Sequence, residues 1–361
     1  MAYTKLPTRE NVQKILGHLK LNEGVIYLNG QVMQERDDTD VELPFRQESN
    51  FYYVTVLQAK YDVDQVIYAD KLSSLIDSAS KVYTLPTTKA DAIAADKVAN
   101  AAEQKKLQNA FIDARLIKAD WEVEIMRKAN KISSDAHVKN NAVMNSPTDV
   151  VLVDAGAEYE LYASDITRVF PVNGKFSPEA RVIYSIVLDM QKACIDLCKA
   201  GVAWEDIHQC ATEIGCDGLL KAGILVGDKA EILEKSVMAA FFPHGIGHSI
   251  GMDVHDVGGY PDGVDRINKP GICNLRMRRT LAAGYAVTVE PGIYFCDFLI
   301  DPVLNHPDTG KYINVDALNK YKSVGGVRIE DNLVITEGAP INLTTVPKEI
   351  DDIEALMAAA K

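Results

Sequence analysis

The chain has 361 residues, of which 47% are hydrophobic and 25% are charged, and this composition is typical of a globular protein rather than a disordered one. At roughly 100–200 residues per domain, the length predicts two or three domains that each bury a core. The 38 Lys and Arg against 51 Asp and Glu give a formal net charge of −13, which excludes nucleic acid and acidic membrane surfaces as expected partners, because both require a basic surface.

The first residues, MAYTKLPTRENVQK, contain no apolar stretch after the first lysine, so we expect no secretory signal and a cytoplasmic protein. A membrane span needs about 18 apolar residues in a row, and the most apolar segment, GIYFCDFLIDPVL, is interrupted by Asp297 and Asp301. None of the cysteines forms a C-x-x-C pair, which favours reduced, mostly buried thiols over disulfides or zinc ligands. They are Cys194, Cys198, Cys210, Cys216, Cys273 and Cys296.

Residues 1–117 combine short strand-like runs with a helical stretch, AADKVANAAEQKKLQNAF, and contain a single histidine, His18. A helix is predicted from Asp120, a capping residue, to about Val143. We place a domain boundary just before this helix, between an N-terminal domain of residues 1–117 and a second domain of residues 118–361. The apolar residues expected to face the core of the second domain are Trp121, Ile125, Ala129, Ile132 and Ala136.

A strand-rich block, VVLVDAGAEYELYASDITRVFPVNG, follows and predicts a hairpin that turns near Tyr159 and Glu160. Ser177 and Pro178 then predict the start of a second helix, which Gly201 can end. The segment WEDIHQCATEIGCDGLLKAG predicts a third helix that stops at Gly223, and the remaining chain is expected to form mainly strands and loops. The apolar stripe expected on the second helix is Ile183, Ile186, Met190, Cys194 and Leu197.

Two carboxylates, Asp154 and Asp165, flank the predicted hairpin turn. Antiparallel strands could present both on one face, where a pair of like charges favours a bound cation. The alternative is that one or both are ordinary turn residues, and for this pair alone that alternative is favoured.

Three of the seven histidines lie within the stretch from His244 to His255. In the segment HGIGH the interleaved Gly245 and Gly247 favour a loop or strand over a helix, so we expect one metal ligand and one substrate-facing histidine. A lone histidine is more often structural, but this clustering favours a functional site.

Two glutamates lie in apolar strand-like segments, Glu290 in AVTVEPGIYF and Glu330 in GGVRIEDNLVIT. A carboxylate between apolar neighbours is costly unless it is paired or bound to a metal. Arg328 lies on the same strand face as Glu330, so a buried ion pair between them is an equally good interpretation of that pair. That ion pair would not explain why a second glutamate, Glu290, also lies in an apolar strand.

Four carboxylates and one histidine form an oxygen-rich ligand set, which suits Mn²⁺, Co²⁺ or Mg²⁺ better than a zinc site rich in thiolates or histidines. Two ions about 3.5–4 Å apart could generate a hydroxide nucleophile and stabilise the oxyanion of an amide hydrolysis. The sequence therefore predicts metal-assisted cleavage of a peptide bond.

At these residues the chain resembles the pita-bread metallopeptidases, the family that includes Xaa-Pro aminopeptidase (aminopeptidase P) and Xaa-Pro dipeptidase (prolidase). The resemblance is carried by VDAGAEYELYASDITRVFPVNGKFSPE, FFPHGIGHSIGMDVHDVGGYPDG, AVTVEPGIYF and VGGVRIEDNLVIT, and it is nearest to the fungal-type Xaa-Pro aminopeptidases. It implies an α+β fold: a pita-bread (creatinase/aminopeptidase-like) catalytic domain after a smaller α/β N-terminal domain. The ligands that it implies are Asp154, Asp165, His248, Glu290 and Glu330.

The same resemblance implies roles for three further residues. His255 would bind substrate and handle protons, Arg328 would hold the substrate or the Glu330 carboxylate, and His244 would lie near the metals without binding them. The expected cofactor is a pair of divalent ions per subunit, with Mn²⁺ favoured, and the expected substrates are peptides with a penultimate proline. A dipeptidase for Xaa-Pro and a non-catalytic peptide-binding module are the alternatives, and a homodimer stays open.

The N-terminal half resembles the family in pieces: ELPFRQESNFYYVT, YDVDQVIYAD and IKADWEVEIMRKANKISSDAH. VLQAK follows FYYVT at once, and only NSPTDV separates the first helix of the catalytic domain from the Asp154 strand. The resemblance implies that a second helix, a strand and a histidine in a His-Tyr motif are missing from the first half of the pita-bread fold. A lost internal strand leaves buried peptide groups unpaired, at about 1–3 kcal/mol each, so we expect weakened folding and activity.

Overall fold

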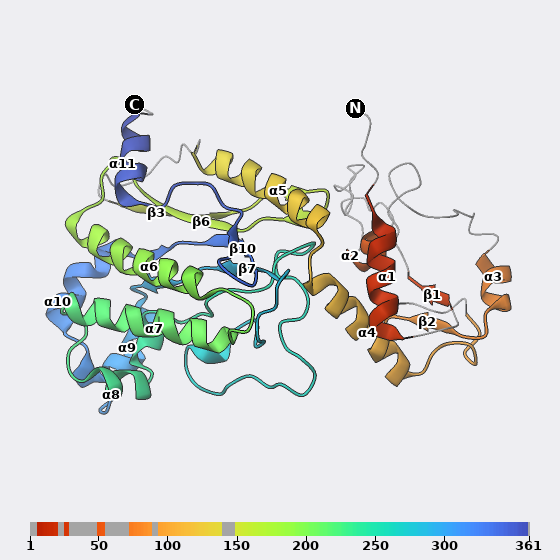
Figure 1. Cartoon of the computed structure of the whole chain (residues 1–361). Helices are drawn as coiled ribbons and strands as arrows, with labels where there is room; N and C mark the ends of the chain where they lie inside the picture. Colours follow the sequence, from red (N-terminus) through yellow and green to blue (C-terminus); the bar gives the residue numbers. More distant parts are fainter. Residues whose placement is uncertain are drawn as a thin grey trace, which may run out of the picture. The chain divides into compact units, whose positions relative to one another are not determined.

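A computed structural model describes residues 6–20, 25–28, 49–54, 72–88, 93–138 and 149–359. The chain divides into two compact units, Met1–Leu116 and Ile117–Lys361 (Figure 1). The segment YDVDQVIYAD lies outside the described residues, as does most of ELPFRQESNFYYVT and of the junction NSPTDV. Among the helices that are described, none is long and apolar enough to cross a membrane.

The described part of the N-terminal unit consists mainly of helices, with β1 and β2 paired in parallel from Val25 opposite Val82. The predicted helical stretch is helical only from Ala101, because Asn100 and Glu103 form a capping box: each side chain accepts from the other's backbone N–H at 3.0 Å. The elements described in this unit are α1 (Thr8–Leu19), β1 (Val25–Tyr27), α2 (Ser49–Val54), α3 (Leu72–Ser78), β2 (Val82–Thr84) and α4 (Ala101–Leu116).

The second unit begins with α5 (Asp120–Val138), the helix predicted from Asp120. Asp120 is its first helical residue rather than its cap, and Glu122 accepts from the Ala119 N–H at 2.7 Å. The predicted apolar stripe is wrong at Ile132, which is 47% exposed, and at Ala136, which is exposed as well. The helix instead buries polar residues that find partners, for example Ser133, whose hydroxyl lies 2.6 Å from that of Ser164.

The predicted hairpin is formed by β3 (Val150–Ala155) and β6 (Ile166–Pro171), which pair antiparallel, with β4 (Glu158–Tyr159) and β5 (Tyr162–Ala163) at its turn. The Asp149 carbonyl accepts from the Val172 N–H at 3.0 Å, so the peptide groups of every second residue from 149 face β6. Those of Val150, Leu152 and Asp154 face the other way, where no described strand pairs with β3. Within the described residues β3 is therefore an edge strand.

Two helices, α6 (Pro178–Leu197) and α7 (Trp204–Lys221), lie side by side in the second unit (Figure 1). The predicted cap is confirmed, since Ser177 accepts from the Ala180 N–H at 3.1 Å. The helix ends before Gly201, at Leu197, which is only half-buried. Gly218 allows the two helices to approach, because a Cβ there would lie 2.5 Å from a side-chain carbon of Ile186.

The strands that carry the C-terminal motifs form two small antiparallel sheets. β7 (Ala286–Val289) pairs with β10 (Asp331–Val334), and β8 (Gly292–Tyr294) pairs with β9 (Gly326–Arg328). Glu290 directly follows β7 and Glu330 directly precedes β10, so the pairing places the two glutamates at the same end of these strands. The remaining elements are α8 (Lys229–Glu234), α9 (Asp297–Leu304), α10 (Val315–Tyr321), β11 (Ile341–Asn342) and α11 (Ile350–Ala359).

Candidate metal centre

One cavity of about 670 Å³ in the second unit is lined by every residue that the sequence singled out as a candidate. Asp154 lines it from β3, and Asp165 lines it from its position directly before β6. The glutamates at the ends of β7 and β10 enter from the facing strands, and the histidines come from the loop before β7. The full set is Asp154, Asp165, His244, His248, His255, Glu290, Arg328 and Glu330.

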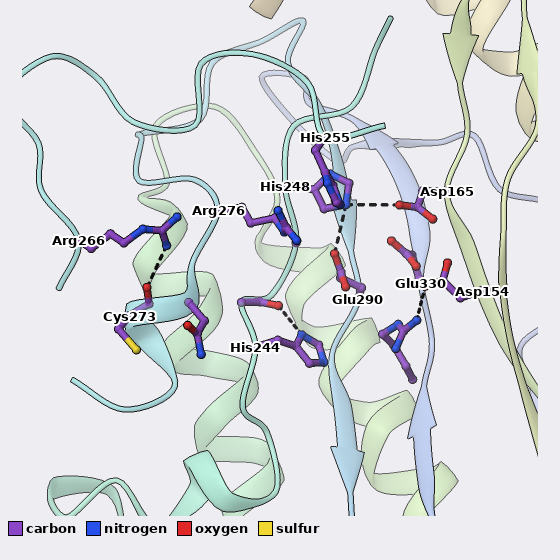
Figure 2. A pocket seen from close by; sticks show the side chains of 14 residues that line it. Asp154, Asp165, His244, His248, His255, Arg266, Cys273, Arg276, Glu290 and Glu330 are labelled. Atoms are coloured by element: carbon purple, nitrogen blue, oxygen red, sulfur yellow. Dashed lines mark hydrogen bonds and ion pairs between the residues drawn. The ribbon is translucent and has the colours of Figure 1, made fainter. Parts of the chain in front are cut away.

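The side-chain oxygens and nitrogens of these residues converge, as Figure 2 shows. Three overlapping groups each bring their ligand atoms within 4.8 Å of one another. Together the groups contain the five predicted ligands and also His255. They are Asp165, His248 and His255; His248, Glu290 and Glu330; and Asp154, Asp165 and Glu330.

His248 presents one particular nitrogen to this cluster. Its Nδ1 lies 3.0 Å from the Ser249 carbonyl oxygen, and because a carbonyl can only accept, Nδ1 carries the proton. Nε2 lies 3.4 Å from a carboxylate oxygen of both Asp165 and Glu290. The neutral tautomer therefore directs its lone pair at the carboxylates, which is the arrangement that a metal ligand needs.

Gly247 explains how the His248 loop comes so close to β7. A Cβ at this position would lie 2.1 Å from the carbonyl oxygen of Thr288, and the φ angle of 157° is rarely adopted by residues with a side chain. The Thr288 N–H donates to the His248 carbonyl at 2.9 Å, which fixes the loop to the strand. The glycine in HGIGH is thus needed for backbone approach.

Glu330 supplies the strongest indication of a cation site. The residue is 1% exposed; Oε2 accepts from the Thr167 hydroxyl at 2.6 Å, whereas Oε1 is buried and has no hydrogen-bond partner among the described residues. Burial, with the nearby charges of Glu290 and Asp165, raises the pKa of Glu330 well above its usual range. A buried carboxylate oxygen with nothing bound to it fits a metal ligand.

The other carboxylates show the same electrostatic strain. Burial raises the pKa of Glu290, and it also raises the pKa of Asp154, to which the charge of Asp165 contributes. At Asp165 burial acts in the same direction, but the hydrogen bond and charge of His248, together with a hydrogen bond to Asp154, outweigh it and lower the pKa. All four carboxylates can be ionised together in this largely buried cavity only if positive charge lies beside them. The donor set fits hard divalent cations.

Arg328 is held by three groups at the side of this cluster. Its guanidinium donates to Asp154 at 2.5 Å, to the Thr167 hydroxyl at 3.1 Å and to the Tyr294 hydroxyl at 3.1 Å. The predicted alternative of an ion pair with Glu330 is absent among the described residues, and Thr167 links the two side chains instead. The Tyr294 hydroxyl also lies 2.8 Å from Nε2 of His244.

The two remaining histidines are biased towards the neutral form. His244 Nδ1 lies 2.8 Å from the Gly245 carbonyl oxygen, and burial lowers the pKa of His244 to about 4. Burial, together with the nearby His248, also lowers the pKa of His255, whose ring lies 4.4 Å from that of His248. Each neutral imidazole presents one N–H donor and one acceptor nitrogen to its surroundings.

Sequence reasoning missed the far wall of the cavity. Arg266, Cys273, Asn274 and Arg276 line it, and Figure 2 shows Arg276 directed towards the histidines. Arg276 is exposed and has no ion-pair partner among the residues that the structure describes. The only signal in the sequence is the basic run LRMRRT, which does not indicate which arginine enters a cavity.

Residues 92–337 match the model of metallopeptidase family M24. The chain belongs to this family. Residues 8–58 match the aminopeptidase P N-terminal domain, so the predicted combination of an N-terminal domain and a pita-bread domain is confirmed. The cavity described above therefore lies in the part of the chain that the M24 model covers.

The most similar relatives include fungal proteins. The chain is 36% identical to "Probable Xaa-Pro aminopeptidase PEPP" of Coccidioides posadasii, over 98% of this chain and 97% of that protein. It is 40% identical to the protein of the same name from Paracoccidioides lutzii, over 94% of this chain and 93% of that one.

Two solved structures have the same fold. The aminopeptidase PepP of Pseudomonas aeruginosa is 26% identical, with a TM-score of 0.74, over 100% of this chain and 99% of the other. Proline aminopeptidase P II from Yersinia pestis is 25% identical, with a TM-score of 0.78, over 98% and 100%. The resemblance predicted from the motifs is confirmed.

The fungal alignment also shows that this M24 chain is shorter than its relative. The alignment with the Coccidioides protein runs over 461 positions, whereas this chain has 361 residues, so at least 100 positions (461 − 361) of that relative have no counterpart here. This agrees with the expectation of internal losses. Where they lie is still a prediction from the sequence.

Proposed function

We propose that this M24 metallopeptidase removes the N-terminal residue from peptides whose second residue is proline, as an Xaa-Pro aminopeptidase. The proposal is supported by the names of its fungal relatives and by the convergence of the predicted ligands in one cavity. The observation that carries the metal assignment is the buried Oε1 of Glu330, for which the described part of the chain offers no hydrogen-bond partner. Residues 1–117 would be the N-terminal domain and residues 118–361 the catalytic domain.

Two divalent ions would be held by Asp154, Asp165, His248, Glu290 and Glu330. When bound, such a pair supplies an activated water and stabilises negative charge on the peptide carbonyl oxygen. Mn²⁺ is the favoured metal, because four of the five donors are carboxylates and hard oxygen donors suit it.

The other side chains of the cavity would position the substrate and move protons. The neutral His255 imidazole faces the cluster and would take up and release a proton during cleavage. His244 orients the Tyr294 hydroxyl, which in turn holds the Arg328 guanidinium. Arg328 would thus bind substrate in a fixed orientation.

Arg276 favours a second candidate, hydrolysis of short substrates that include the Xaa-Pro dipeptide. A guanidinium that is exposed at the far wall could pair with the carboxylate at the end of a dipeptide or tripeptide. A dipeptidase needs such a contact close to the proline, whereas an aminopeptidase can use it further along the peptide or do without it.

The test is a metal count beside a turnover assay on the purified full chain. We expect two equivalents of bound Mn²⁺ and release of the first residue from an Xaa-Pro-Yaa tripeptide, with Xaa-Ala-Yaa as the control substrate. We expect activity about 10²–10⁴ below that of a full-length fungal relative, because a missing hydrogen-bonding or proton-transfer group costs about that much.

Insertion of the relative's segment after Val143, a position outside the described residues, should restore much of the lost activity. Equal activity without the insertion would show that the shortening is harmless. Two bound ions without any turnover, even after the insertion, would instead support the non-catalytic module.

A further inference from the structure

Two cysteines that the catalytic site does not use face each other between α6 and α7. The antiparallel contacts of these helices keep a constant register: Ile186 meets Gly218, and four residues further along α6, Met190 meets Gly215. The next step of four residues reaches Cys194, which this register places opposite Cys210 and Ala211. Because the glycines bring the helix backbones close together, small side chains at this level can touch.

Contacts of the sulfur atoms confirm that register. Cys194 is fully buried, and its Sγ donates to the Ile207 carbonyl of α7 at 3.4 Å, one turn before Cys210. At this register Cys210 lies next to the Cys194 side chain, and the interaction between the two thiols shifts the pKa of each. Cys210 itself is partly exposed. The pair therefore joins a thiol that solvent can reach with one that it cannot.

The environment of Cys210 favours its thiolate. The hydrogen bond from Cys194 lowers the pKa of Cys210 to about 7, against the opposing effects of burial and of the Glu213 charge. Cys194, in contrast, has a pKa raised well above its usual value, first by the same hydrogen bond and then by burial. A reachable thiolate beside a protonated thiol is the arrangement of a reactive cysteine with a resolving partner.

We propose that Cys210 is an oxidation site for hydroperoxides and that Cys194 resolves the oxidised form, closing a disulfide between α6 and α7. In the first step the Cys210 thiolate attacks hydrogen peroxide; an S–O bond forms, the O–O bond breaks, and the departing hydroxide takes up a proton to leave as water. In the second step the Cys194 sulfur displaces that hydroxyl; the S–S bond forms and the Cys194 proton leaves in the second water. Peroxide is reduced and the two sulfurs together lose two electrons.

The disulfide would connect helices that support the catalytic strands. α6 packs against β7, β8 and β9. Glu290 directly follows β7, and Arg328 is the last residue of β9. A covalent link between α6 and α7 restricts the unfolded chain, so the oxidised protein should unfold at a higher temperature than the reduced one.

The test is treatment of the native full chain with a small excess of hydrogen peroxide. We expect an intact mass lower by about 2 Da, reversed by a reductant, and a non-reducing peptide map that joins the Cys194 and Cys210 peptides. Tm should rise on oxidation and return on reduction. We also expect Cys210 to react about tenfold faster than the other partly exposed thiols, Cys273 and Cys296.

Variants separate the two steps. Cys210→Ser should abolish the mass change, whereas Cys194→Ser should leave a sulfenic acid at Cys210 that dimedone traps. Cys198→Ser is the matched control, since Cys198 is buried directly after the end of α6, and it should leave the disulfide unchanged. Oxidation of Cys210 without a cross-link in the wild-type chain, or reaction no faster than that of Cys273, would overturn the proposal.

Discussion

Arg328 donates through Nη2 to Oδ2 of Asp154, so a predicted substrate-holding residue is paired with a predicted metal ligand. The same guanidinium is anchored independently by Thr167 and Tyr294. If Asp154 turns one oxygen to a cation, Arg328 therefore keeps its position. A metal ion could therefore replace Arg328 as the partner of Asp154 while the guanidinium stays in place.

The ligand assignment predicts a loss of bound metal when a carboxylate is removed. Asp165→Ala and Glu290→Ala should each abolish tight binding of a second ion, because each deletes an anionic donor from the cluster. The measurement is metal content by mass spectrometry after gel filtration. Glu337→Ala, an exposed carboxylate outside the cavity, is the control. Two tightly bound ions in both cavity variants would contradict the assignment.

Metal affinity should fall as the pH is lowered through neutrality. Burial alone would lower the pKa of His248, but the hydrogen bond with Asp165 and the charge of Glu290 outweigh it and raise the pKa. Protons therefore compete with the metal for Nε2 already above about pH 6.5, the usual pKa of histidine. Below the raised pKa, the affinity for metal should fall about tenfold per pH unit. Titration calorimetry in buffers of different ionisation enthalpy should detect proton release on binding. An affinity unchanged between neutral and mildly acid pH would argue against a histidine ligand.

Arg276 should distinguish peptides by their C-terminal group. Arg276→Ala should lower kcat/KM for a free Xaa-Pro-Yaa acid by about 10–100-fold, the usual value of a charged hydrogen bond, and have little effect on the corresponding amide. Arg181→Ala, which removes an ion pair with Glu354 outside the cavity, is the control. Equal losses on the acid and the amide would show that Arg276 does not bind the carboxylate.

Asp331 should make the fold sensitive to acid. Burial opposes its ionisation, but Arg168 at 2.6 Å and Lys348 at 2.7 Å outweigh this and hold its pKa well below the usual range. Because the pKa is lower in the folded state, the stabilisation is complete above the unfolded value near 3.9 and is lost as the pH falls below it.

Asp331→Asn should therefore reduce the free energy of unfolding at pH 7 by about 3–5 kcal/mol, since it leaves the Arg168 charge buried without its partner. Urea unfolding followed by circular dichroism measures this. Lys348→Met keeps the inner pair and should cost less, and the exposed Asp316→Asn should change stability by under about 0.5 kcal/mol. A loss for Asp331→Asn no larger than that of Asp316→Asn would show that the buried pair adds no stability.

The sequence predicts the parts of this protein that depend on local patterns. Ser177 and Pro178 fix the start of α6, and the turn residues between Asp154 and Asp165 fix the hairpin that brings these carboxylates together. The glycines in HGIGH were enough to exclude a helix for the histidine segment. Local conformational preferences decide each of these features.

Features that depend on distant partners could not be predicted. The buried face of α5 includes Ser133 because its hydroxyl contacts that of Ser164, which directly follows β5. The periodicity of apolar residues indicated Ile132 instead. Arg276 enters the cavity through the path of a long loop, which no spacing rule describes. The same is true of Thr167, whose hydroxyl connects Arg328 to Glu330.

The one-sided pairing of β3 has a kinetic consequence for the proposed metals. Asp154 is the one carboxylate of the cluster on a strand whose outer peptide groups lack a described neighbour, and its side chain is 47% exposed. Strand edges open more often than sheet interiors, so a donor on β3 swings away more often than one beside β7 or β10. The two ions should therefore leave at different speeds when a chelator is added, in a fast phase for the ion that Asp154 helps to hold and a slow phase for its neighbour.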